Sequence, residues 1–269
     1  MFDADRRVVE RMAPFLQRVL IVDPQPSSAR LIDDLMRDIS RAHTWITTST
    51  EKGLRLAATC EPQIIFVEFS SGAVNGLKFT RDLRRSTLHC RQAPVIMVTS
   101  TATAQGILAA RDAGVHEFLR KPFSLKDLLR RLEAVTLRHR DWVEGIAYIG
   151  PDRRRFNSGD YSGPLKRGTD ETPDQARVVQ ALKILRVAVA AVEKDPEQAL
   201  RAMLAQSAII QHAATAEANI KMTKAAAEFY RYITQTAAHE GRLSKEALEG
   251  HAAALLSFLP KDASDRDAA

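Results

Sequence analysis

The sequence predicts an α/β domain with a doubly wound parallel sheet, followed by an all-helical region. Short apolar runs recur along the N-terminal half, and amphipathic segments with helical spacing fill the intervals between them. The all-helical region is predicted by a second observation, an alanine-rich stretch over 174–259 that lacks strand-like alternation. The chain has 269 residues, of which 45% are hydrophobic, so it is long enough to form two cores of ordinary size.

Each predicted strand is a short apolar run bounded by polar or turn residues. The five expected strands are Arg18–Asp23, Thr44–Thr50, Ile64–Phe69, Pro94–Ser100 and Glu117–Lys121. The helices expected between and after them are Ser27–Ile39, Glu51–Thr59, Leu77–Arg84, Ala104–Ala113 and Ser124–Leu137, and the last of these is expected to continue to about Trp142.

Polar side chains stand at the carboxyl ends of the four strongest runs. Asp23 follows Val-Leu-Ile-Val in the first run, Glu68 follows Ile-Ile-Phe-Val in the third, Thr99 follows Val-Ile-Met-Val in the fourth, and Lys121 ends the fifth. Ligand sites of open α/β sheets lie outside the carboxyl ends of their strands, so these four side chains should converge on one crevice. Two carboxylates, a hydroxyl and an ammonium predict a site for phosphoryl chemistry.

Four stretches carry a resemblance to a known family. They read VLIVDPQPSSARL, IIFVEFSSGAVNGL, APVIMVTSTA and ARDAGVHEFLRKPFSLKDLLRRL, in this order from residue 19 to residue 132. Residues 18 to about 138 resemble the receiver (CheY-like) domain of two-component response regulators, which implies a flavodoxin-like sheet with strand order 2-1-3-4-5. The resemblance gives Thr99 and Lys121 the roles of phosphoryl-binding hydroxyl and lysine, and Phe118 the role of aromatic switch.

Two positions depart from the receiver pattern. The family has a phosphorylated aspartate where this chain has Glu68, and it has a second acid beside Asp23 where this chain has Pro24. The replacement of that acid by Pro24 argues against Mg²⁺ binding, and we expect no cofactor and no metal site. The sequence thus predicts a pseudo-receiver in which Glu68 either imitates a phosphoryl group or is inert.

The segment 143–173 is basic and turn-rich, and we expect it to be a linker. It contains a repeat in which tyrosine, a Gly-Pro turn and paired cations recur 13 residues apart, at Tyr148 and Tyr161. Such a pattern suits an anionic ligand stacked on a ring. The alternative is an arm that packs back on the receiver-like domain. The candidate anion-binding residues are Arg153, Arg154, Arg155, Lys166 and Arg167.

The predicted organisation has five parts: an N-terminal lead-in over 1–16, a receiver-like domain over 17–142, the linker, a helical hairpin or bundle over 174–259 and a disordered tail over 260–269. The two cysteines are too few for a disulfide framework. A mean hydropathy of -0.22 without a long apolar stretch predicts no membrane span. The charged N-terminus lacks the pattern of a secretion signal, so we expect a cytoplasmic location.

The resemblance implies a non-enzymatic signalling protein that acts through protein contacts, with a histidine kinase or another signalling protein as partner. Two alternatives stay open: an effector that binds a nucleotide second messenger through the arginine-rich linker, and a conventional phosphorylated response regulator. Dispersed basic residues argue against DNA binding. Whether the C-terminal helices form a homodimer is left open by the sequence.

Overall fold

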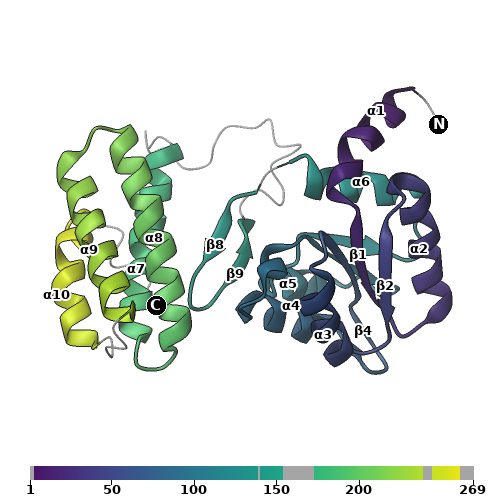
Figure 1. Cartoon of the computed structure of the whole chain (residues 1–269), viewed down its shortest axis with the longest axis horizontal. Coiled ribbons are helices and arrows are strands. Elements are labelled where there is room, and N and C mark those ends of the chain that lie inside the picture. Colours follow the sequence, from purple (N-terminus) through teal and green to yellow (C-terminus); the bar gives the residue numbers. More distant parts are fainter. Residues whose placement is uncertain (1–2, 139, 154–172, 239–243, 261–269) are drawn as a thin grey trace. The chain divides into compact units, whose positions relative to one another are not determined.

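The computed structural model describes residues 3–138, 140–153, 173–238 and 244–260 (Figure 1). The chain divides into two compact units. The N-terminal unit comprises Met1–Val143 with Tyr148–Gly159, and the C-terminal unit comprises Glu144–Ala147 with Asp160–Ala269.

A five-stranded parallel sheet forms the centre of the N-terminal unit. Its order is β2-β1-β3-β6-β7, which is the predicted order 2-1-3-4-5 once the small strands β4 and β5 are set aside. The doubly wound α/β prediction is therefore confirmed. The strands of the sheet are β1 (Arg18–Val22), β2 (His43–Thr47), β3 (Ile64–Glu68), β6 (Val95–Thr99) and β7 (Glu117–Arg120).

The two faces of the sheet are covered by separate hydrophobic cores. Alternate residues of each strand point to opposite faces, so Ile64 and Phe66 contribute to one core while Ile65 and Val67 contribute to the other. Helices α1, α2 and α6 cover the first face, and α3, α4 and α5 cover the second. Their bounds are α1 (Asp3–Met12), α2 (Pro26–Ser40), α3 (Thr50–Cys60), α4 (Gly76–Arg85), α5 (Ala104–Asp112) and α6 (Leu125–Thr136).

Helix starts in this unit are set by local capping. The side chains of Ser49, Asn75 and Thr103 accept hydrogen bonds from main-chain N–H groups in the first turns of α3, α4 and α5. Ser124 and Asp127 form a reciprocal capping box at the start of α6. Each cap satisfies N–H groups that would otherwise lack partners, which explains why the predicted helix starts agree closely with those observed.

The structure departs from the prediction at both ends of the sheet domain. The lead-in contains helix α1 and a short 3-10 helix η1 (Ala13–Phe15), and Met12 and Leu16 are fully buried in the first core. Helix α6 ends at Thr136 and does not continue to Trp142. Arg140 instead pairs with Glu117 of β7 at 2.8 Å and donates to the His116 carbonyl oxygen.

Part of the predicted linker is a two-stranded sheet of β8 (Trp142–Glu144) and β9 (Ile149–Pro151). Within the N-terminal unit, the Trp142 ring lies over the guanidinium of Arg84, which is buried at the end of α4. Arg84 donates hydrogen bonds to the carbonyl oxygens of Gly114, Arg91 and Ala93. These bonds satisfy a charge that would be costly to bury without partners.

The described part of the C-terminal unit contains four helices, which share one core that includes Leu182, Met203 and Phe229. They are α7 (Pro173–Ala191), α8 (Pro196–Ala216), α9 (Ile220–Ala238) and α10 (Lys245–Leu256). The predicted all-helical region is confirmed, and Asp195 caps α8 as its sequence suggests. In the same unit, buried Gln198 donates to the carboxylate of Glu144 at 2.8 Å.

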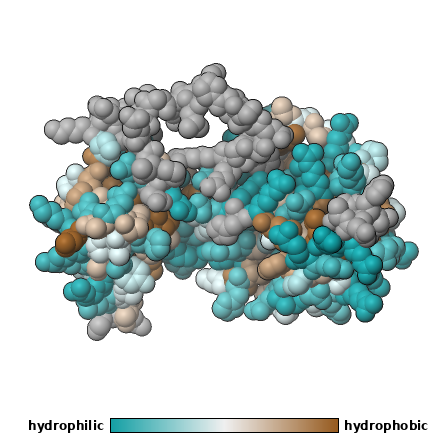
Figure 2. Space-filling view, turned by 90° about the horizontal axis from the view of Figure 1, so that it is seen from above, coloured by the Kyte–Doolittle hydropathy of each residue, from teal (hydrophilic) through white to brown (hydrophobic). Residues whose placement is uncertain are grey.

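Most large apolar side chains among the described residues are buried in these cores. Figure 2 shows mainly hydrophilic residues on its visible surface, with hydrophobic ones in small groups, as is usual for folded domains. Among the described residues, no helix is long and apolar enough to cross a membrane. The predicted tail lies almost wholly outside the described residues, since 261–269 are not among them.

Candidate functional site

Four predicted side chains lie at the carboxyl edge of the sheet. Glu68 and Thr99 are the last residues of β3 and β6, while Asp23 and Lys121 directly follow β1 and β7. These strands are consecutive neighbours in the sheet, so their carboxyl ends meet at one edge. Strands β3 and β6 are apolar up to this point because they are buried between two helical layers, and polar residues appear where the chain leaves the sheet.

The centre of the site is an ion-pair network. The Nζ atom of Lys121 lies 2.5 Å from Oε2 of Glu68 and 2.9 Å from Oδ2 of Asp23. The side chain of Lys121 is 18% exposed, and those of Glu68 and Asp23 are 8% and 2% exposed. Burial lowers the pKa of Lys121, but its hydrogen bonds to Glu68 and Asp23 outweigh burial, so the pKa lies above its ordinary value. Lys121 is therefore a permanent cation at neutral pH.

Asp23 is fully engaged by the protein. Its Oδ1 accepts from the main-chain N–H of Gln25 at 2.8 Å, and its Oδ2 accepts from the hydroxyl of Ser28 at 2.6 Å as well as from Lys121. Ser28 was not singled out from the sequence, although its place in the first turn of α2 was a usable signal. Asp23 is thereby held rigidly at the strand end.

The donor set does not fit the Mg²⁺ site that the receiver family implies. Mg²⁺ takes one or two carboxylates and keeps several waters, which requires carboxylate oxygens free to face it. Here the ammonium of Lys121 binds both carboxylates, and Pro24 supplies none. The described residues contain no group of three or more His, Cys, Asp or Glu side chains arranged to hold a metal ion.

Thr99 lies at the same edge but is not joined to this network. Its hydroxyl donates to the carbonyl oxygen of Thr101 at 3.2 Å and accepts from the Thr101 N–H at 3.1 Å. The second oxygen of Glu68, Oε1, accepts from the N–H of Phe69 at 3.2 Å. Glu68 thus reaches Lys121, while the hydroxyl of Thr99, which was expected to bind a phosphoryl oxygen, bonds within its own loop.

Phe118 lies on β7 next to this network. Its side chain is half-buried and packs against the core on the α3, α4 and α5 face. The ring meets that of Phe69 edge to face, with centroids 6.4 Å apart. Phe69 directly follows Glu68 in the chain, so the proposed switch residue and the acid at the phosphorylation position are linked through one aromatic contact.

The loop after β3 folds into the small hairpin β4 (Ser70–Ser71) and β5 (Val74–Asn75). Gly76 ends this loop, and a Cβ there would lie 2.4 Å from the carbonyl oxygen of Glu68, so only glycine fits. The buried hydroxyl of Thr50 accepts from the Asn75 N–H at 2.9 Å, which ties the hairpin to the start of α3. Sequence analysis identified neither the hairpin nor Thr50.

The candidate anion-binding residues are only partly described. Arg153 pairs with Asp112 of α5 at 2.6 Å, and its guanidinium lies 4.1 Å from the ring centroid of Tyr148. The cation and ring of the first repeat therefore contact each other and Asp112 within the N-terminal unit. Arg154, Arg155, Lys166 and Arg167 lie outside the described residues, and anion binding by them stays a prediction.

Comparison with known proteins identifies the class of the N-terminal unit. Residues 19–133 match the family model of the response regulator receiver domain. This unit therefore contains a receiver domain of two-component signalling, followed by a helical C-terminal region, and the resemblance found in the sequence is confirmed.

Curated relatives share this part of the chain. The KDP operon transcriptional regulatory protein KdpE of Escherichia coli is 28% identical over 165 residues, covering 61% of this chain and 64% of KdpE. The DNA-binding dual master transcriptional regulator RpaA of Synechocystis is 28% identical over 136 residues, covering 49% of this chain and 54% of RpaA. The chain thus spans between about half and two thirds of these regulators. The chemotaxis protein CheY of Pseudomonas aeruginosa is 25% identical over 118 residues, which are 44% of this chain and 94% of CheY.

Solved structures of low sequence identity also match. A putative response regulator from Chloroflexus aurantiacus is 20% identical with a TM-score of 0.42, covering 45% of this chain and 98% of that one. A two-component response regulator from Clostridium difficile is 19% identical with a TM-score of 0.41, covering 45% and 97%.

Proposed function

We propose that this protein is a non-enzymatic two-component signalling protein whose receiver domain is not phosphorylated and which acts through protein contacts. The observation that carries the proposal is the buried network in which Lys121 binds both Glu68 and Asp23. A side chain that must accept a phosphoryl group needs a carboxylate oxygen that the phosphoryl donor can reach from solvent. Glu68 has Oε2 on Lys121 and Oε1 on a main-chain N–H, with 8% of its side chain exposed.

The length of the side chain also opposes phosphorylation. Glutamate places its carboxylate one methylene further from the main chain than aspartate does, so in-line attack would start about 1 Å out of place. A displacement of this size costs on the order of a hundredfold in rate. The missing acid at Pro24 removes a ligand for the Mg²⁺ ion that would neutralise and orient a phosphoryl donor.

The geometry supports a partial imitation of the phosphorylated state. Glu68 provides a permanent negative charge for Lys121, as a phosphoryl group would in a receiver. A carboxylate carries one charge, however, whereas a phosphoryl group carries about 1.5 to 2 and has three acceptor oxygens. Thr99 bonds within its own loop, so only the lysine half of the imitation is present. We infer that the receiver domain is held in one arrangement.

The partners belong to the same proposal. The partner is a histidine kinase or another signalling protein, and the contact surface is formed by α5, β7 and α6 around Phe118. The C-terminal helical unit is the output or dimerisation module, and the protein acts in the cytoplasm. DNA binding is not part of the proposal, although the name of RpaA describes a DNA-binding protein.

The test is phosphorylation by acetyl phosphate with Mg²⁺, read by intact mass. Three proteins are compared: the wild type, the double variant Glu68→Asp with Pro24→Asp, and that double variant with Thr99→Ala added. We expect no mass increase in the wild type, one phosphoryl group on the double variant, and a lower yield when Thr99 is removed. A phosphoryl group on the wild type would return the protein to the conventional response regulators.

A further inference from the structure

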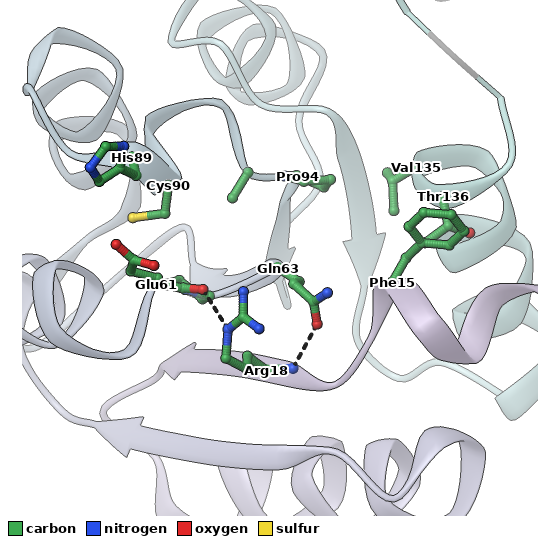
Figure 3. Close-up of a pocket in the computed structure, with 11 residues that line it drawn as sticks. Phe15, Arg18, Glu61, Gln63, His89, Cys90, Pro94, Val135 and Thr136 are labelled. Atoms are coloured by element: carbon green, nitrogen blue, oxygen red, sulfur yellow. Dashed lines mark hydrogen bonds between the residues drawn. The ribbon is translucent and has the colours of Figure 1, made fainter.

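A cavity lies at the opposite end of the sheet from the Lys121 network. Arg18 opens β1, Gln63 precedes β3 and Pro94 precedes β6, whereas Glu68 closes β3. Five-residue strands separate the two ends by about 16 Å. The cavity has a volume of about 340 Å³ and receives further walls from Phe15 of η1 and Val135 of α6 (Figure 3). This size lies at the low end for small-molecule sites.

The polar floor of the cavity is held in place by main-chain contacts. Nε of Arg18 donates to the carbonyl oxygen of Glu61 at 2.9 Å. Oε1 of Gln63 accepts from the N–H groups of Gln17 and Arg18, and its Nε2 donates to the carbonyl oxygen of Pro14 at 3.2 Å. Gln63 thus fixes the start of β1 and the segment that carries Phe15, so the guanidinium and the apolar wall are pre-organised.

Two opposite charges face this cavity without pairing to each other. Arg18 uses only Nε, and its two Nη atoms make no hydrogen bond or ion pair with any residue that the structure describes. The carboxylate of Glu61 likewise has no such partner in the described ranges. In Figure 3, Arg18 stands between Glu61 on one side and Phe15 with Val135 on the other. Charge and apolar surface are therefore arranged in a fixed order along the cavity.

We propose that this cavity binds a small zwitterion of the α-amino acid class that carries an apolar side chain. The Nη atoms of Arg18 bind its carboxylate, since a guanidinium presents two parallel donors that match two carboxylate oxygens. The carboxylate of Glu61 binds its ammonium. The side chain of the ligand packs between Phe15, Val135 and Pro94, which lie on the far side of Arg18 from Glu61.

The experiment titrates the isotope-labelled full chain with three probes and follows main-chain amide signals by NMR. The probes are L-leucine, isocaproate, which lacks the ammonium, and isoamylamine, which lacks the carboxylate. Concentrations reach about 10 mM, where a Kd of about 1 mM is measurable. We expect leucine to shift signals around Gln63 and Val135, and each truncated probe to bind up to about fivefold more weakly. Absence of leucine binding, or isocaproate binding as tight as leucine binding, overturns the proposal.

Charge variants then test each contact. Arg18→Gln should abolish binding of both leucine and isocaproate, whereas Glu61→Gln should weaken leucine but strengthen isocaproate, because a repelling carboxylate is removed. The controls Arg55→Gln and Glu51→Gln change the same charges on the exposed side of α3 and should leave binding unchanged. Equal effects of Glu61→Gln on both probes, or leucine binding that survives Arg18→Gln in a folded protein, would refute the assigned contacts.

Discussion

Replacing Lys121 with methionine should destabilise the N-terminal unit strongly, because two buried carboxylates then face each other without a cation. Breaking a buried ion pair costs about 3 to 5 kcal/mol. Lys121 keeps 18% of its side chain exposed, so we expect the lower end, about 3 kcal/mol. For a unit of this size, that corresponds to a fall in Tm of roughly 6 to 12 °C.

Tryptophan fluorescence in urea measures this loss. The two tryptophans of the chain, Trp45 and Trp142, both belong to the N-terminal unit, so the signal reports on that unit alone. The pKa of Lys121 is raised above 10.5, so its contribution is present throughout the neutral range and is lost only as the pH rises through that raised pKa. The loss caused by Lys121→Met should therefore be the same at pH 7 and pH 9.

The matched control is Lys78→Met. Lys78 also lies 2.5 Å from its partner Asp82, but their side chains are 66% and 38% exposed, so solvent screens the pair and its loss should hardly move the midpoint. Adding Glu68→Gln to Lys121→Met should restore more than half of the lost stability, because one unpaired carboxylate is removed. If Lys121→Met cost no more than Lys78→Met, the argument from the buried network would be wrong.

Three further predictions concern the N-terminal unit. Burial and the nearby Arg84 hold the pKa of His116 well below its ordinary value. The unfolded chain therefore binds a proton that the folded unit does not, and the free energy of unfolding should decline as pH falls below about 6.5. Urea titrations at several pH values should show a smaller decline for His116→Asn. Gly114 has a φ of +89°, and a Cβ there would lie 2.5 Å from the Ile149 carbonyl oxygen. Gly114→Ala should therefore lower the free energy of unfolding by about 2 kcal/mol or more in the same fluorescence assay. An unchanged urea midpoint would contradict this close approach. Burial raises the pKa of Cys60 to about 11, so a thiol reagent should label Cys60 only after unfolding. Rapid labelling of Cys60 in the folded protein would contradict its burial.

The sheet domain could be predicted because its signals are local. Apolar runs such as Ile64–Phe69 mark strands buried on both faces, and capping residues such as Ser124 mark helix starts. The two strands within the predicted linker could not be predicted, for the opposite reason. Strand β9 sits against α4 and Trp142 covers Arg84, and these contacts join residues more than fifty positions apart that no local pattern connects.

In the candidate site, too, some features follow from the sequence and others only from the tertiary structure. The sequence by itself determined that Asp23, Glu68, Thr99 and Lys121 would reach one edge, because parallel strands place their carboxyl ends together. Only the tertiary structure decided which of them bond: Lys121 spans the distance to both acids, while Thr99 turns to its own loop. Whether two side chains form a hydrogen bond depends on differences of a few tenths of an ångström in the distance between their atoms. These distances are fixed by the packing of the whole domain. The cavity around Arg18 could likewise not be predicted from the sequence, because its walls come from stretches 15–18, 61–63, 89–94 and 135–136, which are far apart in the chain.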